Sequence, residues 1–447
     1  MFPVSDKPIE NAGVLISGDK IVEVGKTREL LSKYPDEDVR DLKMAAIMPG
    51  FVNLHTRLER TMLRGTVADE PYANWLLKTY HLSSKMSSQE KYDAACVGCV
   101  EAIRTGVTTV ADIAFTDAPV RALNEYGLRG VVFRDTGCLE KSEVEVEIDD
   151  ARRDIYDWQQ EASEDRLKIG VSPSAVFEAH PLNFTRCAAL AREEKIPLQV
   201  RVGGSVEELE FIMRGTSMFR KHAQDYVELT QATVQPWLPF GVRPVQLLKN
   251  WDAFDADDVS VVHAIHVDDP DIATFKEFGV GICSCPASEA QLGMGIAPLS
   301  DFLKAGLSVG LGSDSPAASE AHGMLSEMRF GMLLHRASYV KRFLKSSQIL
   351  KLCTLGGAKV LHMDDKIGTL EPGKQADIVA VDLSKSLQIV ELNPISAVIN
   401  SCTSSDVELT MVAGKILYDS GKFAFSIEPL EMLEKMKESR KKLAELE

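Results

Sequence analysis

The sequence predicts an α/β protein whose main part is a (β/α)8 TIM barrel. Eight short apolar runs are spread through its middle, and helix-like sequence follows most of them. Together these runs and helices span roughly 300 residues, which is the size of eight such units. Before and after this region the chain shows short strands separated by turns. Both ends are therefore expected to be rich in β-structure.

The N-terminal β-structure is predicted from residues 13–25, where two apolar runs flank a Ser-Gly-Asp turn. Near the other end, residues 376–382 form a continuous apolar run typical of a buried strand. Residues 409–418 follow as two strands around Ala413-Gly414. From residue 427 onward, Glu, Lys and Leu alternate in a pattern that predicts an amphipathic helix.

The barrel is predicted from eight candidate strands, which are 46–55, 107–112, 130–133, 167–171, 197–202, 259–263, 279–283 and 307–314. In barrels of this kind the active site lies at the carboxyl ends of the strands. That rule alone directs attention to five side chains, which are His55, Arg57, Arg201, His263 and Asp314.

The composition of the chain excludes several classes of protein. The 447 residues are 45% hydrophobic and 26% charged, values typical of globular proteins. Lys and Arg number 50 against 66 Asp and Glu, so the formal charge is −16. Because an acidic surface repels phosphate backbones, we expect no binding to nucleic acid.

The chain also carries signals of its compartment. No apolar stretch reaches the roughly 18 residues of a spanning helix, and the first residues lack the pattern of a signal peptide. Eight cysteines are scattered along the sequence, as expected for free buried thiols in a reducing compartment. We therefore expect a cytoplasmic protein that does not associate with membranes.

Motifs along nearly the whole chain resemble those of the amidohydrolase superfamily. They include Pro-Gly-Phe-Val-Asn-Leu-His-Thr at 49–56, Val-His-Ala-Ile-His at 262–266, Cys-Pro-Ala-Ser at 285–288 and Gly-Leu-Gly-Ser-Asp at 310–314. The segments Leu-Arg-Gly at 63–65 and Trp75-Leu76 resemble its deaminase and triazine-hydrolase branch, and residues 49–65 look closest to nucleoside-type deaminases.

The resemblance implies a metal-bearing (β/α)8 barrel joined to a small β-sandwich that both termini build. It places the sandwich at residues 1–46 and 365–425, the barrel at 47–364 and a C-terminal helix at 426–447. It also implies a small-molecule ligand and a homodimer or larger homo-oligomer. The activity it implies is hydrolysis of C–N bonds in cyclic amidines.

The family chemistry uses one divalent ion, usually zinc or iron. Two histidines lie two residues apart on the first strand, so that both point the same way. A third histidine comes from the fifth strand and an aspartate from the eighth. The ion lowers the pKa of bound water to ~7, and a fifth-strand glutamate moves the proton.

Carried over to this chain, the resemblance reveals a degenerate metal site. His55 matches the first ligand, but Arg57 stands at the second ligand position. Arg201 stands at the fifth-strand ligand position, and Gly204 replaces the proton-moving glutamate. Asp314 matches the last ligand.

Three further positions complete the comparison. His263 matches the sixth-strand histidine that orients water or substrate. Ser174 stands where the branch commonly has a substrate-contacting histidine, and Glu289 stands where it often has asparagine. Glu289 is a candidate contact for one of the arginines.

Arginine cannot replace a histidine ligand, because it stays protonated and has no lone pair to offer. We therefore expect no metal cofactor at the usual position. Arg57 and Arg201 with Asp314 carry the same net charge as a zinc ion with that aspartate. We hypothesise that the arginines replace the ion electrostatically by pairing with Asp314, and that their planar groups suit a carboxylate or phosphate ligand.

Three functions remain open from the sequence. In the first, Arg57 and Arg201 bind an anionic heterocycle while His263 or His55 handles protons. In the second, the arginines only neutralise a dead site, and the barrel is a catalytically retired binding or partner subunit. In the third, His55, His263 and Asp314 hold a metal as a site of two histidines and one carboxylate.

Overall fold

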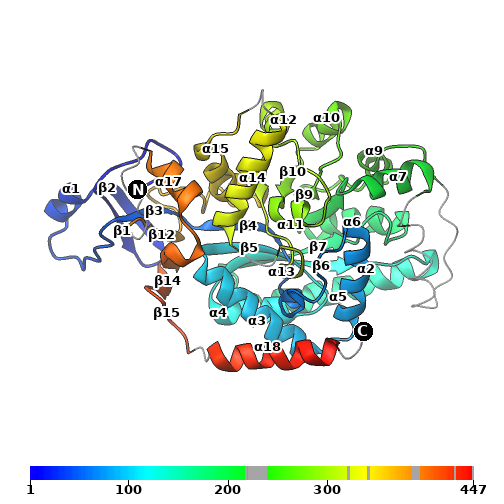
Figure 1. Cartoon of the computed structure of the whole chain (residues 1–447), viewed down its shortest axis with the longest axis horizontal. Helices are drawn as coiled ribbons and strands as arrows, with labels where there is room; N and C mark the ends of the chain where they lie inside the picture. The colour runs from blue at the N-terminus through cyan, green and yellow to red at the C-terminus, as the bar shows by residue number, and fades with distance from the viewer. Residues whose placement is uncertain are drawn as a thin grey trace.

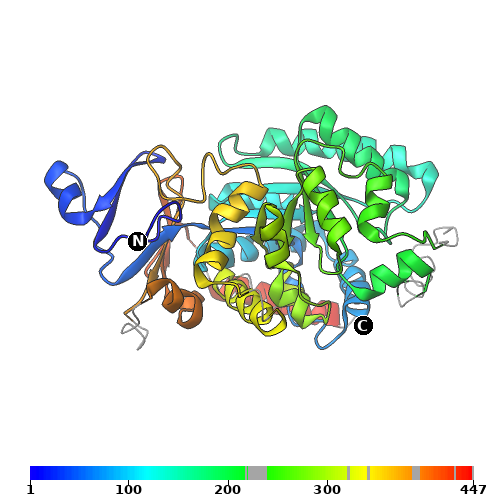
Figure 2. The same ribbon diagram turned by 90° about the horizontal axis from the view of Figure 1, so that it is seen from above.

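The computed structural model describes residues 1–216, 219, 239–319, 323–339, 343–384, 393–426 and 429–444. Figure 1 shows a β-rich unit at one side, a larger barrel beside it and helix α18 along one edge of the barrel. The same two units lie side by side when the molecule is turned by 90° (Figure 2). None of the described helices is long and apolar enough to cross a membrane.

The barrel consists of eight parallel strands that pair in chain order. They are β4 (Phe51–Thr56), β5 (Val107–Ala114), β6 (Arg129–Thr136), β7 (Leu167–Pro173), β8 (Leu198–Val202), β9 (Val259–His263), β10 (Gly281–Ser284) and β11 (Val309–Leu311). A parallel bridge between Thr56 and Asp314 brings the last strand back to the first. The predicted barrel of eight strands is confirmed.

Helices surround these strands because each carries one apolar stripe. In α5 (Val144–Glu161), the buried residues Val144, Ile148, Ala151, Ile155 and Trp158 recur at helical spacing. The other barrel-side helices are α2 (Tyr72–Ser84), α3 (Ser88–Arg104), α4 (Ala118–Tyr126), α6 (Pro181–Glu194), α7 (Val206–Arg214), α9 (Pro244–Asn250), α10 (Asp269–Glu277), α11 (Pro286–Gln291), α12 (Leu299–Ala305), α13 (Pro316–Ser319), α14 (Met324–Ser338), α15 (Ser346–Lys351) and α16 (Gly357–Val360).

The smaller unit contains two antiparallel sheets, as expected for a β-sandwich. One is the hairpin of β1 (Ala12–Ser17) and β2 (Lys20–Lys26), followed by α1 (Thr27–Lys33). The other holds β3 (Ala45–Pro49), β12 (Ile378–Asp382), β13 (Val407–Val412), β14 (Lys415–Asp419) and β15 (Lys422–Phe423), with α17 (Pro394–Ser401) inserted after β12. Ile21 from the first sheet packs with Ile378 from the second.

The predicted strand 46–55 is divided in the structure. Residues before Gly50 form β3 in the sandwich, and residues after it form β4 in the barrel. A Cβ atom at Gly50 would lie 2.1 Å from the Thr108 hydroxyl oxygen, so the chain passes between the units where only glycine fits. A buried ion pair also links the two units at this junction, with 2.8 Å between Arg129 Nε and Asp377 Oδ2.

The C-terminal helix α18 (Pro429–Ala444) runs beside α3 (Figure 1). The ends of the predicted segment 426–447, at 427–428 and 445–447, lie outside the described residues. All eight cysteines are buried and free, as the sequence predicts.

Candidate active site at the barrel mouth

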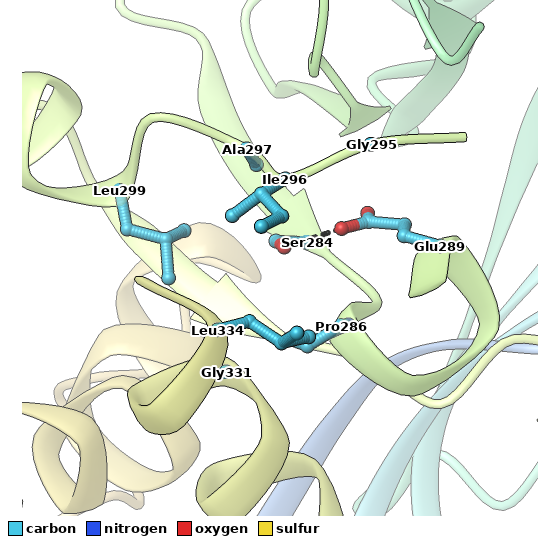
Figure 3. Close-up of a pocket in the computed structure, with 9 residues that line it drawn as sticks. All are labelled: Ser284, Pro286, Glu289, Gly295, Ile296, Ala297, Leu299, Gly331 and Leu334. Atoms are coloured by element: carbon cyan, nitrogen blue, oxygen red, sulfur yellow. Dashed lines mark hydrogen bonds between the residues drawn. The ribbon is translucent and has the colours of Figure 1, made fainter. Parts of the chain in front are cut away.

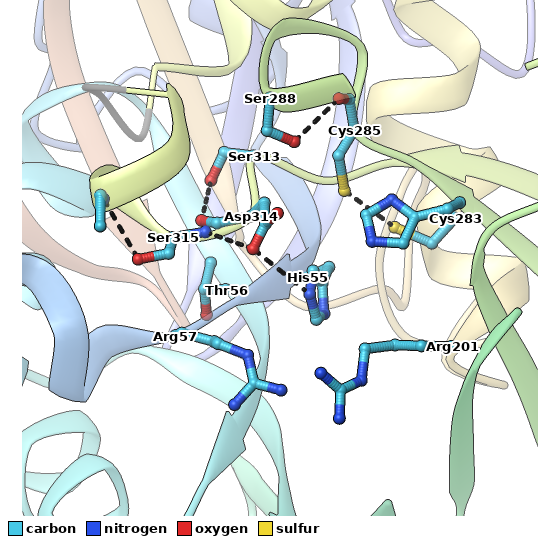
Figure 4. Close-up of polar contacts among 12 residues, drawn as sticks. His55, Thr56, Arg57, Arg201, Cys283, Cys285, Ser288, Ser313, Asp314 and Ser315 are labelled. Atoms are coloured by element: carbon cyan, nitrogen blue, oxygen red, sulfur yellow. Dashed lines mark hydrogen bonds and ion pairs between the residues drawn. The ribbon is translucent and has the colours of Figure 1, made fainter. Parts of the chain in front are cut away.

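The structure brings together three residues that the sequence places far apart. His55 is the next-to-last residue of β4, His263 ends β9 and Asp314 follows β11. One side-chain ligand atom from each lies within 4.8 Å of the others, and all three residues are buried. The backbone of His263 has φ +75° and that of Asp314 φ +59°, an unusual conformation for residues other than glycine. Figure 4 shows Asp314 and His55 above the two arginines.

The hydrogen bonds of Gln199 define the tautomer of His55. Gln199 Nε2 donates to the Leu54 carbonyl at 3.2 Å and to the Ser260 hydroxyl at 3.3 Å. Its Oε1 atom therefore accepts from His55 Nδ1, at 3.1 Å. The Nε2 atom of His55, 3.6 Å from Asp314 Oδ1, is left as an acceptor.

The electrostatics keep His55 neutral. Burial lowers the pKa of His55 to about 3, although Asp314 acts in the opposite direction. A lone pair and a carboxylate thus face each other across the site. A hydrogen-bond donor, a proton or a cation between them would stabilise this arrangement.

His263 is oriented by Glu289. His263 Nδ1 lies 3.3 Å from Glu289 Oε1, which also accepts from the backbone N–H of Cys285 at 2.7 Å. Glu289 Oε2 accepts from the Ser284 hydroxyl at 3.0 Å, as Figure 3 shows. The cavity beside them measures about 10 Å³, which holds no more than one water. The expected contact of Glu289 with an arginine is therefore replaced by a contact with His263.

The two arginines pair with Asp135, which the sequence interpretation missed. Arg57 Nη1 donates to Asp135 Oδ2 at 3.0 Å, and Arg201 Nη2 lies 3.8 Å from Asp135 Oδ1. The hydroxyl of Ser174 donates to the same Oδ1 at 3.0 Å. The expected pairing of the arginines with Asp314 is wrong, because both guanidinium groups lie against Asp135, whereas Asp314 Oδ1 lies 3.6 Å from Nε2 of the neutral His55.

Asp135 is fully buried, and burial alone would raise its pKa. The positive charges of Arg57 and Arg201 outweigh burial and hold the pKa of Asp135 below its usual value. Asp135 is the next-to-last residue of β6, so the rule that pointed to the other strand ends could also have identified it. It was overlooked because the predicted third strand stopped at residue 133.

The arginines retain unused hydrogen-bonding capacity. Arg57 Nη2 and the Nε and Nη2 atoms of Arg201 are buried and have no hydrogen-bond partner among the described residues. Arg201 Nη2 has only longer ion-pair contacts, to Asp135 and, at 3.5 Å, to Glu178 Oε2. Leaving buried donors unpaired costs about 1–3 kcal/mol each, so such groups favour a ligand that accepts from them.

A third buried arginine lies beside this pair and was also missed. Arg60 belongs to the 3-10 helix η1 (Leu58–Leu63), and its guanidinium lies 4.8 Å from the ring centre of Tyr80. Burial and the nearby Arg57 lower the pKa of Arg60. Asp112 fixes the start of η1, since its Oδ1 accepts from the Thr56 hydroxyl and from the Leu58 N–H, both at 2.7 Å.

A cavity of about 110 Å³ opens beside the arginine cluster. Its walls are mainly apolar and aromatic, and its polar lining side chains include Ser174 and Glu178. The full lining consists of Ala73, Leu76, Leu77, Tyr80, Phe115, Gly137, Leu139, Ser174, Phe177, Glu178 and Phe219. Ser174 and Glu178 thus lie between the cavity and the charged cluster that they contact.

The site does not fit the full ligand set of the family's metal ion. His55, His263 and Asp314 offer three ligand atoms, but the two remaining positions carry guanidinium groups that cannot bind a cation. Both arginines also repel positive charge, and each contributes to lowering the pKa of His55. We therefore derive no reaction step through a metal.

The family of this chain is identified by comparison with known proteins. The sequence profile of the amidohydrolase family matches residues 46–417. The chain belongs to the amidohydrolase family. A second profile, the bacterial imidazolonepropionase-like composite domain, matches residues 12–36. That segment contains the hairpin of β1 and β2 and the whole of α1 after it.

Relatives of this amidohydrolase are deaminases. It is 31% identical to a 5-methylthioadenosine/S-adenosylhomocysteine deaminase of Thermoanaerobacter pseudethanolicus, over 92% of this chain and 90% of the relative. A protein of the same name from Syntrophomonas wolfei is 28% identical and covers 99% of the chain and 97% of its own length. The deaminase branch that the sequence resembles is confirmed.

Solved structures support the same fold. An adenosine deaminase from Xanthomonas campestris with bound zinc superposes with a TM-score of 0.84 at 23% identity, covering 99% of this chain and 96% of that one. An atrazine chlorohydrolase from Arthrobacter aurescens in complex with zinc gives 0.79 at 24% identity, covering 97% and 95%. At these identities the similarity concerns the fold.

Proposed function

We propose that this amidohydrolase binds a small, anionic, planar heterocycle at its barrel mouth without a metal ion at the usual family position. The observation that carries the proposal is the pair of buried guanidinium groups with unpartnered N–H groups, on Arg57 and Arg201. A carboxylate or phosphate offers the lone pairs that these donors need.

The charge of the cluster supports an anionic ligand. Three buried arginines, Arg57, Arg60 and Arg201, lie near two carboxylates, Asp135 and Glu178. Counted over these five groups alone, one positive charge remains in a site largely shielded from water, where charges interact more strongly than at the surface. The adjoining cavity, with Tyr80, Phe115 and Phe177 in its wall, suits a flat apolar ring.

A chemical role is available to the histidines within this proposal. His55 is neutral, and its Nε2 atom, 3.6 Å from Asp314 Oδ1, is an acceptor that can receive a hydrogen bond from a donor on a bound ligand. Arg57 and Arg201 would stabilise negative charge on such a ligand. Any hydrolysis of a C–N bond here would need these residues in place of the proton-moving glutamate, whose position holds Gly204.

The proposal is tested by isothermal titration with anionic and neutral heterocycles of the same shape, such as nicotinate and nicotinamide. We expect nicotinate to bind and Arg201→Gln to weaken that binding at least tenfold, since a lost charge-assisted hydrogen bond costs about 1.5–3 kcal/mol. Equal binding of both compounds in wild type and variant would contradict the anionic ligand.

Two alternatives have their own supporting observations. The pairing of Arg57 with Asp135 neutralises part of the site, as in a catalytically retired barrel that acts as a binding or partner subunit. The convergence of His55, His263 and Asp314 supports a three-residue metal site. Size measurement by light scattering tests the expected homo-oligomer, and zinc titration followed by elemental analysis tests the metal site.

A further inference from the structure

The cavity beside the arginine cluster contains a carboxylate of the protein itself. Among the side chains that line it, Glu178 is the acidic one, and it lies in the loop between β7 and α6. Glu178 Oε2 is 3.5 Å from Arg201 Nη2 and accepts a hydrogen bond from the Ala175 N–H at 3.0 Å. A carboxylate thus already lies between the cavity and an arginine with unpartnered donors.

The contact between Glu178 and Arg201 is loose compared with the contact that holds Arg57. At 3.5 Å it is longer than a charge-assisted hydrogen bond, which measures about 2.7–2.9 Å. Asp135, by contrast, is fully buried and receives hydrogen bonds from Arg57 and Ser174. The Glu178 side chain is 18% exposed, so it has a path to solvent that Asp135 lacks.

We propose that Glu178 occupies the place of the ligand's acidic group in the free protein, and that the ligand is an aromatic monocarboxylate which displaces it from Arg201. This inference rests on the proposed function. Exchange of one carboxylate for another leaves the charge of the cluster unchanged. The aromatic ring of the ligand is inferred from the size of the cavity. Its volume of about 110 Å³ approaches the roughly 150 Å³ of an engineered apolar cavity that binds benzene in another protein.

Displacement makes Glu178 a specificity-determining residue. A neutral ring gains nothing from Arg201 and leaves Glu178 in place. A cationic ring would instead be attracted to Glu178 and repelled by Arg57, Arg60 and Arg201. Exchange of the Glu178 carboxylate for that of the ligand therefore favours anionic ligands, even though an acidic side chain lines the cavity.

The test uses three probes of one shape, benzoate, benzamide and benzamidine, whose charges are −1, 0 and +1. Their affinities are measured by isothermal titration with the full-length protein and with Glu178→Gln, which keeps the side chain's length and an acceptor for Ala175. Glu193→Gln is the matched control, because Glu193 pairs with Arg152 on the exposed surface and is not among the residues that line the cavity. We expect Glu178→Gln to tighten benzoate about tenfold, with benzamide unchanged and no effect in the control.

Three results would overturn the inference, and each says what becomes of the proposed function. If Glu178→Gln leaves benzoate unchanged while Arg201→Gln abolishes its binding, displacement is wrong but the anionic ligand stands. If benzamidine binds the wild type but not Glu178→Gln, the Glu178 carboxylate accepts a hydrogen bond from the ligand. The site then prefers cationic to anionic ligands. If benzoate binds neither wild type nor Glu178→Gln, both the inference and the proposed function fail.

Discussion

Arg57 and Asp135 form a buried ion pair at the barrel mouth, with 3.0 Å between Nη1 and Oδ2. In the family this end of β4 provides a histidine for a metal ion. Here the side chain of Arg57 reaches across to the end of β6, and its Nη2 atom has no hydrogen-bond partner in the part of the chain that the structure describes. This pair is the basis of our proposal that the chain itself provides, with its own counter-ion, the positive charge that an ion provides in the family.

Removal of that counter-ion is predicted to destabilise the fold. Asp135→Asn leaves Arg57 and Arg201 buried without their shared carboxylate, which we expect to cost about 3–5 kcal/mol of the free energy of unfolding. Urea denaturation measures this change in the free energy of unfolding. Asp154→Asn, which removes a partly exposed partner of Arg134, is the control and should cost no more than about 1 kcal/mol. Equal effects of the two substitutions would show that Asp135 does not compensate the arginines.

The same ion pair predicts a dependence of stability on pH. Because the arginines hold the pKa of Asp135 below its usual value, its stabilising effect is complete above the unfolded pKa of about 3.9. The effect is lost as the pH falls through the lower folded pKa. Acid unfolding monitored by circular dichroism should therefore be less steep below pH ~4 in Asp135→Asn than in wild type. Acid-unfolding curves of equal steepness below pH ~4 in the two proteins would contradict this effect of Asp135.

His55 predicts a second pH effect at a higher range. Burial lowers its pKa to about 3 from a usual value of 6.5, so the unfolded chain binds a proton that the folded chain does not. Stability from this group is complete above pH ~6.5 and declines as the pH falls toward 3. The variant His55→Gln should show a smaller loss of melting temperature between pH 7 and pH 4. An unchanged loss would indicate that folding does not lower the pKa of His55.

Restoring the family ligands is predicted to restore metal binding. The double variant Arg57→His, Arg201→His adds two imidazole ligands to His55, His263 and Asp314 and removes two repelling charges. We expect it to bind zinc at micromolar concentration, measured by competition with a chromophoric chelator. Arg129→His, at the junction of the two units, is a control that should gain no zinc. A double variant without zinc affinity would mean that the ligand positions are assigned wrongly.

The strand pattern of the sequence was sufficient to predict the barrel. Runs such as 107–112 and 259–263 are rich in valine and buried throughout, because both faces of a parallel strand are covered. The division of 46–55 at Gly50 was not predicted, since the two strands belong to different sheets yet form one apolar run. Only the tertiary contact with Thr108 explains the break.

The candidate site was predicted in its residues but not in its pairings. The strand-end rule identified His55, His263 and Asp314, which the structure brings together. Whether the arginines pair with Asp314 or with Asp135 depends on the directions of their long side chains. The strand-end positions alone do not determine these directions. Arg60 and Glu178 lie beyond the strands, in η1 and in a loop, where the rule gives no guidance.

The metal content of the protein tests the central claim most directly. Protein purified without chelator is analysed by plasma mass spectrometry for all transition metals. We expect less than about a tenth of an equivalent of metal per chain, because arginines stand at two ligand positions. About one equivalent of zinc or iron would contradict it, and would make His55, His263 and Asp314 the ligands of a metal-dependent hydrolase.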